Sequence, residues 1–167
     1  MAGLLLKDIF ESFFTSPREV GGFLLLTALL LVLAEAFGQR RRELGAMNWL
    51  DALLIGIGQA ASITPGLSRS GTTMSVGMYR GMTRDAAARF SFILSIPIIL
   101  GAGIIQSFSL GEGEMSAQAP ELLVGFVAAG VSGYLAIRLF LAFLRRQKLY
   151  PFAVYCVVAG VLAIIFL

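Results

Sequence analysis

The sequence contains no histidine and only one cysteine, Cys156. The lack of histidine removes the most common general base and the most common metal ligand in proteins. A single cysteine cannot form an internal disulfide bond, and Cys156 lies inside an apolar run. The sequence therefore excludes a mechanism that uses a histidine of this chain and a fold that depends on an internal disulfide bond.

Charged residues are also scarce, at 14% of 167 residues, whereas 57% are hydrophobic and the mean hydropathy is +0.85. A water-soluble domain could not bury that much apolar surface. The net charge of +3 does not indicate nucleic-acid binding, because the basic residues cluster at the ends of apolar runs, where they orient membrane proteins. We therefore expect an all-α polytopic membrane protein with no nucleic-acid partner.

Four apolar runs approach or exceed the roughly 18 to 20 residues that a helix needs to cross the bilayer, although the last is of marginal length. Residues 1–19 carry several charges and no small-residue cleavage pattern follows them, so we expect an interfacial lead-in instead of a cleaved signal peptide. The remaining residues, 20–167, are expected to form a single transmembrane domain. The four predicted spans are 20–37, 90–108, 122–143 and 152–167.

Two arginine-rich connections predict the orientation of the spans. One contains the arginines at positions 40–42, and the other contains Arg145, Arg146 and Lys148. Both should face the cytoplasm, whereas the connection at 110–121, with three glutamates and no lysine or arginine, should lie on the opposite side.

Given this orientation, the stretch between the first two spans must leave and return on the same face, which predicts a re-entrant helical hairpin at about 48–80. Its arms, 49–63 and 70–79, are short for a crossing. Between them Pro65 removes a backbone donor, and Gly66 and Gly71 permit tight turning, so the helix should break there. Broken helices are tolerated in a bilayer only when they are buried in protein or line a wet cavity.

The predicted break carries one positive charge and four hydroxyl groups within six residues. The free N–H groups and positive dipole end of the second arm should point into the break, where Arg69 offers a bidentate fork to phosphoryl oxygens. An arginine at that depth costs at least about 2.5 kcal/mol unless water or an anion compensates it. The sequence therefore predicts a phosphate-binding site. The cluster comprises Ser68, Arg69, Ser70, Thr72 and Thr73.

A purely structural interpretation competes with this one, in which Arg69 pairs with a distant carboxylate and the hydroxyls cap short helices. Arg138 is expected to reach the interface or to pair with Glu35. Gln59 and Ser62 are expected to form interhelical hydrogen bonds.

Two further local predictions concern the helices themselves. Thr83 should be the N-cap of the following span. Pro97 should kink that span near its middle.

The stretch Pro-Gly-Leu-Ser-Arg-Ser-Gly-Thr-Thr at 65–73 closely resembles the Pro-Gly-x-Ser-Arg-Ser-Gly-x-Thr signature of the undecaprenyl-diphosphatase family of bacitracin-resistance type. The likeness continues through Gly-Met-Thr-Arg-Asp-Ala-Ala-Ala-Arg-Phe-Ser-Phe at 81–92 and Ser-Ile-Pro at 95–97. It is strong over roughly 48–103 and collinear, but looser, from about residue 8 to the end. So long a run is specific for this family.

The resemblance implies a hydrolase of the bacterial plasma membrane that converts undecaprenyl diphosphate to undecaprenyl phosphate, which recycles the lipid carrier for cell-wall synthesis. It also implies dependence on Mg²⁺ or Ca²⁺ and a fold of inverted repeats, of which this chain would be one half. By position, Arg69 and Ser68 would be catalytic, with Arg69 clamping the diphosphate. The substrate-binding residues would be Gly66, Ser70, Gly71, Thr72 and Thr73.

The chain departs from the family pattern because it lacks the glutamate-rich motif and the Ser-Ser-Thr-Gly-His segment that precede the signature in full members. We therefore expect this chain to supply the phosphate-binding half, with a separate N-terminal half or a second copy as its partner. The alternative is a non-enzymatic protein that binds lipid phosphates, or half of a transporter.

Overall fold

The computed structural model describes residues 17–109 and 119–166, and most of these residues are helical. The only β pairing among them is an isolated bridge between Arg42 and Met82. The predicted lead-in at 1–19 falls largely outside the described residues, as does most of the acidic connection. The elements are α3 (Pro17–Phe37), the 3₁₀ turn η1 (Leu44–Ala46), α4 (Trp49–Ala61), α5 (Arg69–Tyr79), α6 (Arg84–Ser109), α8 (Ala119–Leu144) and α9 (Tyr150–Phe166).

Three helices, α3, α6 and α8, are long and apolar enough to cross a membrane. Helix α9, with 17 residues, reaches the lower limit for a span, as the sequence predicts. Each long helix begins a few residues before the predicted apolar run, because polar residues such as Arg84 and Asp85 join its first turn. The structure confirms an all-helical, multi-pass membrane protein.

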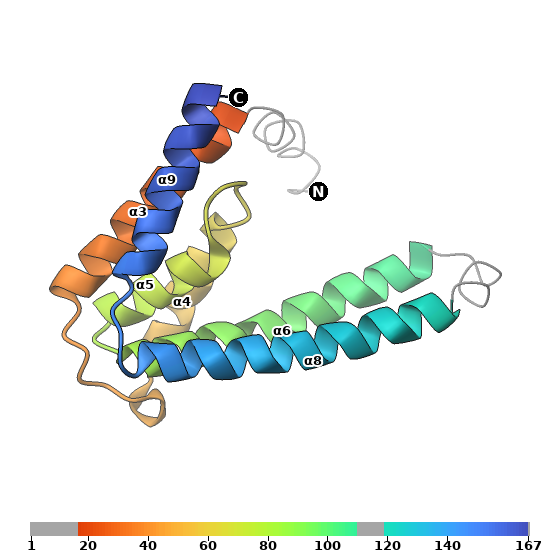
Figure 1. Cartoon of the computed structure of the whole chain (residues 1–167). Helices are drawn as coiled ribbons and strands as arrows, with labels where there is room; N and C mark the ends of the chain where they lie inside the picture. Colours follow the sequence, from red (N-terminus) through yellow and green to blue (C-terminus); the bar gives the residue numbers. More distant parts are fainter. Residues whose placement is uncertain (1–16, 110–118, 167) are drawn as a thin grey trace, which may run out of the picture.

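The helices form two pairs that diverge from a common end, α3 with α9 and α6 with α8 (Figure 1). Helices α3 and α9 approach closely at two glycines, since a Cβ added to Gly21 would lie 2.7 Å from the carbonyl oxygen of Gly160. Close approach at small residues is the usual way in which helices pack in lipid. Helices α4 and α5 lie between the two pairs (Figure 1).

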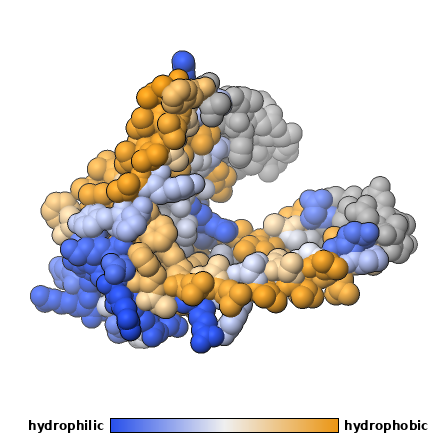
Figure 2. Space-filling view, in the orientation of Figure 1, coloured by the Kyte–Doolittle hydropathy of each residue, from blue (hydrophilic) through white to orange (hydrophobic). Residues whose placement is uncertain are grey.

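Apolar side chains cover much of the visible surface of the two pairs, whereas hydrophilic residues gather at the end where the pairs meet (Figure 2). Helix α8 is exposed along almost its whole length. This distribution is the one expected for a protein whose long helices face hydrocarbon and whose polar end lies at the bilayer surface.

Helices α4 and α5 form a helical hairpin at the predicted place, and its entry and exit on one face of the membrane stay a prediction. They have 13 and 11 residues, so they extend about 20 and 17 Å at 1.5 Å per residue, well short of the roughly 30 Å of hydrocarbon in a bilayer. They pack against each other closely at Gly58, where an added Cβ would lie 3.0 Å from a methyl group of Val76. The two arms are therefore each too short to cross a bilayer alone.

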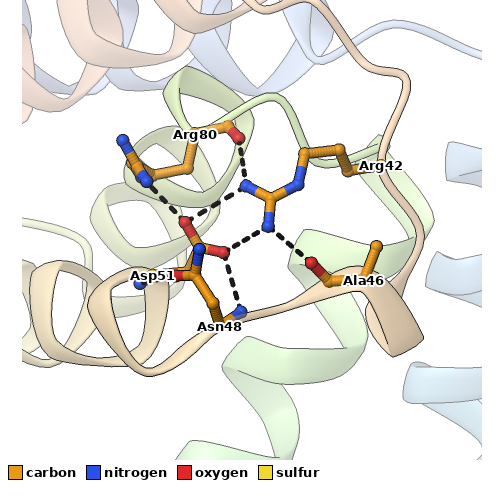
Figure 3. A network of polar contacts seen from close by, with 5 residues as sticks. All are labelled: Arg42, Ala46, Asn48, Asp51 and Arg80. Atoms are coloured by element: carbon orange, nitrogen blue, oxygen red, sulfur yellow. Dashed lines mark hydrogen bonds and ion pairs between the residues drawn. The ribbon is translucent and has the colours of Figure 1, made fainter.

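A buried carboxylate holds the base of the hairpin together (Figure 3). The side chain of Asp51 is fully buried, and its oxygens lie 2.6 Å from Arg42 Nη2 and 2.8 Å from Arg80 Nε. Asp51 also forms a capping box with Asn48 at the start of α4. These contacts connect the entry and exit of the hairpin to the segment that follows α3.

A second buried carboxylate, Glu35, joins the two arginine-rich connections. It forms ion pairs with Arg40 and Arg84 and accepts a hydrogen bond from the backbone N–H of Leu149. The predicted pairing of Glu35 with Arg138 is therefore wrong, because two nearer arginines occupy the carboxylate and Arg138 is exposed on α8. Both arginine-rich connections lie at the same end of the molecule.

Two smaller predictions concern α6. Thr83 is its N-cap, as predicted, since its hydroxyl oxygen accepts a hydrogen bond from the backbone N–H of Ala86 at 3.2 Å. Helix α6 continues through Pro97, and the kink at this proline stays a prediction.

Candidate functional site

The connection between α4 and α5 consists of short hydrogen-bonded turns, and it contains one glycine whose backbone lies in the left-handed region of φ/ψ space. Gly66 has a φ of +86°, which side chains rarely allow. A Cβ at this position would also lie 2.3 Å from the carbonyl oxygen of Val20 in α3. Glycine is thus required at position 66 both by the backbone conformation and by the neighbouring helix.

Thr27 of α3 fixes this turn. Its hydroxyl oxygen accepts a hydrogen bond from the backbone N–H of Ser68 at 3.0 Å, and the hydroxyl group lies 3.1 Å from the carbonyl oxygen of Phe23 and 3.4 Å from that of Gly66. Thr27 is fully buried. Its role could not be predicted from the sequence, because a threonine inside an apolar span carries no local signal of a contact 41 residues away.

The turn ends at Ser68, which is the N-cap of α5. Its hydroxyl oxygen accepts a hydrogen bond from Gly71 N–H at 3.2 Å, and its carbonyl accepts one from Thr72 N–H at 2.8 Å. The N–H groups of Arg69 and Ser70 have no partner among the described residues. The first turn of α5 therefore presents two free donors at the positive end of the helix.

The side chain of Arg69 is exposed and forms no ion pair or hydrogen bond within the described part of the chain. The buried carboxylates Glu35 and Asp51 already pair with other arginines. The structure thus offers no described carboxylate partner for Arg69, and its charge is available to a ligand.

A cavity of about 620 Å³ lies beside Arg69, on the α4 side of the turn. Gln59 contributes to its wall, and its buried Oε1 atom has no hydrogen-bond partner among the described residues. The predicted interhelical bonds are not seen here, since Ser62 Oγ donates to the carbonyl of Gln59 in its own helix. The lining residues are Gly56, Gln59, Ala60, Ser62, Ile63, Arg69 and Ile98.

A second cavity, of about 290 Å³, lies on the other side of the first turn of α5. Ser68, Ser70 and Gly71 form one part of its wall, and mostly apolar side chains of α3, α5, α8, α9 and the connection between α8 and α9 form the rest. The two serines and Arg69 therefore line different cavities.

The two threonines of the cluster, Thr72 and Thr73, are buried in the protein. Thr73 is fully buried, and its hydroxyl lies 2.7 Å from Ser91 Oγ of α6 and 2.8 Å from the carbonyl oxygen of Arg69, to which it donates. Thr72 Oγ1 is buried without a described partner. A Cβ on Gly71 would lie 3.0 Å from a methyl group of Thr27, so Gly71 lets α5 approach α3. A direct substrate contact by any of the three stays a prediction.

The described residues do not form a site for Mg²⁺ or Ca²⁺ by themselves. Both cations take oxygen ligands, carboxylates foremost among them. Neither cavity at the turn is lined by a carboxylate, and no group of three or more Asp, Glu, His or Cys side chains gathers anywhere in the described ranges. The metal dependence that the resemblance implies is not accounted for by these residues.

Comparison with known proteins agrees with the motif. The family model of Bacitracin resistance protein BacA matches residues 1–162. A protein named Undecaprenyl-diphosphatase from Methanothermobacter thermautotrophicus is 46% identical over 165 residues, which cover 97% of this chain and 91% of that relative. Proteins of the same name from Halothermothrix orenii and Alkaliphilus metalliredigens are 41% and 39% identical over 98% of this chain.

The chain spans 63% and 60% of the length of the latter two relatives, but nearly all of the first. The prediction that this chain is only the phosphate-binding half of an enzyme is therefore not supported. The family match, which covers almost every residue, together with the free arginine at a tethered hairpin turn, leads to one conclusion: the chain belongs to the Bacitracin resistance protein BacA family.

Proposed function

We propose that this protein hydrolyses undecaprenyl diphosphate to undecaprenyl phosphate and inorganic phosphate in the bacterial plasma membrane. The observation that carries the proposal is the exposed Arg69 side chain, which has no described partner and adjoins two free N–H groups of α5. A guanidinium beside a helix N-terminus suits a diphosphate, and the names of the relatives support this substrate.

In the proposed reaction, water supplies the oxygen that bonds to the terminal phosphorus, and the bond from that phosphorus to the bridging oxygen breaks. Negative charge grows on the phosphoryl oxygens and on the bridging oxygen as this bond breaks. Arg69 and the N–H groups of Arg69 and Ser70 stabilise that charge. They are held in place before substrate arrives, because Thr27 and Gly66 fix the turn.

Ser68 and Ser70 extend the proposed headgroup site. Ser68 Oγ accepts a hydrogen bond from Gly71, so its O–H group is left to donate to a phosphoryl oxygen. The cavity next to these serines is mostly apolar, with Phe140 and Phe152 in its wall. A polar rim beside an apolar cavity supports an amphiphilic substrate over a soluble phosphate ester.

For the membrane orientation, we propose that both arginine-rich connections face the cytoplasm, as their positive charge favours. The hairpin turn lies at the far end of α5 from this polar surface, one helix length of about 17 Å away. A site at that depth would receive a diphosphate headgroup from within the bilayer.

The test is release of inorganic phosphate from undecaprenyl diphosphate by the purified full chain in detergent. Arg69→Ala should lower kcat/KM by about 10²-fold or more, the effect of removing one donor to a developing charge. Arg138→Ala is the matched control, since it removes an exposed arginine from an apolar helix away from the turn. Equal rates for the wild type and Arg69→Ala would overturn the proposal.

A second candidate is binding of lipid phosphates without hydrolysis, as in a carrier. It is favoured by the lack of a carboxylate at either cavity within the described residues, because a general base is needed to activate water. Saturable binding of the lipid by a wild-type protein that releases no phosphate would select this candidate.

A further inference from the structure

A separate, smaller cavity lies at the base of the hairpin, at the opposite end of α5 from Arg69. It has a volume of about 250 Å³ and is lined by three arginines, with no carboxylate in its wall. The lining residues are Gln39, Arg41, Arg42, Tyr79, Arg80 and Gly81.

The backbone around this cavity is firmly connected. The N–H groups of Arg41 and Arg42 both donate to the carbonyl of Gly81 at 2.9 Å, and Thr83 N–H donates to the carbonyl of Arg42 at 2.9 Å. Gly81 has a φ of +84°, so the turn after α5 is one that glycine permits. The backbone that carries the three arginines is therefore held by hydrogen bonds between the segment after α3 and the turn after α5.

The positive charge in the cavity exceeds the negative charge that contacts it. Asp51 is the one described carboxylate bonded to these arginines, and it pairs with Arg42 and with Nε of Arg80 (Figure 3). The Arg41 side chain has no described partner, and the same holds for the two terminal nitrogens of Arg80. Three guanidinium groups against one buried carboxylate leave two positive charges facing the cavity.

The neighbouring cavity, of about 390 Å³, differs in this respect. It is lined by Arg40, Arg84 and Arg145, but also by Glu43 and Asp85, and Glu35 pairs with two of its arginines. Its charges are balanced. Of these two cavities, the one lined by Arg41, Arg42 and Arg80 is therefore the one that favours an anion.

Exposed aromatic residues place this cavity at the level of lipid headgroups. Phe37, Trp49 and Tyr79, at the ends of α3, α4 and α5, are 73%, 76% and 42% exposed. Aromatic side chains of this kind concentrate at the membrane–water interface. The hydrophilic residues at this end adjoin the apolar faces of the helices (Figure 2). A lipid whose acyl chains lie along those faces would bring its phosphate to the arginines.

We infer that the cavity of Arg41, Arg42 and Arg80 binds the phosphate of an anionic phospholipid headgroup. This site is distinct from the proposed active site, because the length of α5 separates them. Bound lipid would bridge the segment after α3 to the exit of the hairpin and so stabilise the base on which the turn stands.

The experiment measures lipid binding to the intact full chain by native mass spectrometry, with phosphatidylglycerol and phosphatidylcholine as probes. Arg41→Gln should weaken phosphatidylglycerol binding about fivefold, the effect of one basic residue near an anionic membrane surface. Arg41 suits this test, because its side chain supports no described contact in the fold. Arg146→Gln is the control with the same charge change, since Arg146 is exposed in the other arginine-rich connection at this end of the molecule but does not line the cavity.

The inference predicts that phosphatidylglycerol binds more tightly than phosphatidylcholine and that only Arg41→Gln weakens it. Equal losses in the two variants would mean a diffuse basic surface and would overturn the site. Equal binding of the two lipids, or displacement of phosphatidylglycerol by inorganic phosphate at similar concentration, would overturn the assignment to an anionic lipid.

Discussion

The two carboxylates that are buried within the described ranges pair with arginines other than Arg69. Glu35 pairs with Arg40 and Arg84, and Asp51 pairs with Arg42 and Arg80. Placing an unpaired arginine in hydrocarbon costs at least about 2.5 kcal/mol, and binding of an anion or water to Arg69 would offset that free energy. At the scale of single residues, this difference in pairing is what distinguishes a ligand-binding arginine from a structural one.

Thr27 allows a residue-scale prediction. Thr27→Val keeps the shape of the side chain but leaves the N–H of Ser68 without its acceptor. An unsatisfied buried donor costs about 1–3 kcal/mol, so we expect a loss of this size in the free energy of unfolding, measured in mixed detergent micelles. Phosphate release should also fall, because the turn that carries Arg69 is no longer fixed.

Thr27→Ser provides the control, since it retains the hydroxyl and removes one methyl group. It should keep most of the activity that Thr27→Val loses. If both variants lose activity equally, packing of the methyl group matters and the hydrogen bond to Ser68 does not position the turn.

At the scale of elements, the hairpin depends on its base. Asp51→Asn should lower the free energy of unfolding by about 2 kcal/mol, less than the 3–5 kcal/mol of a fully buried pair, because Arg42 and Arg80 are 30% and 34% exposed. The measurement is unfolding in mixed micelles, with the exposed Glu121→Gln as control. A variant as stable as the control would show that the ion pairs do not hold the hairpin.

The helices could be predicted closely from the sequence, and the contacts between them could not. The hairpin and its turn were predicted from the lengths of the apolar runs and from Pro65 and Gly66. Helix α5 begins one residue earlier than predicted, at Arg69. These are local signals. The tether from Thr27 and the close approach of Gly21 to Gly160 join residues far apart in the chain, and no local pattern in one sequence encodes which distant residues meet.

The same limit applied to the charged residues. Pairing with Glu35 was one of two alternatives predicted for Arg138, because both residues were expected near the same face, but the fold brings Arg40 and Arg84 to Glu35. The cluster at 68–73 was predicted as one unit, whereas α5 turns Ser68 and Ser70 towards one cavity, Arg69 towards another and Thr73 into the core. Helical rotation of about 100° per residue separates neighbours in sequence.

At the scale of the whole molecule, the two helix pairs diverge and leave the hairpin turn between them (Figure 1). Helix α8 and the second half of α6 contact little else among the described residues. Their apolar faces suit lipid, and the expected association with a second copy stays a prediction. The central claim is that the hairpin enters and leaves the membrane on the same side, so that its turn places Arg69 within the bilayer, about one length of α5 from the polar surface.

Labelling of single cysteines from each side of oriented membrane vesicles tests this claim most directly. In a Cys156→Ala background, Gly45→Cys reports the segment before the hairpin, Gln147→Cys the connection between α8 and α9, and Glu121→Cys the start of α8. All three positions are exposed. The account predicts that an impermeant maleimide labels positions 45 and 147 from the same side and position 121 from the other. Labelling of positions 45 and 147 from opposite sides would contradict it, because α4 and α5 would then make a net crossing of the membrane.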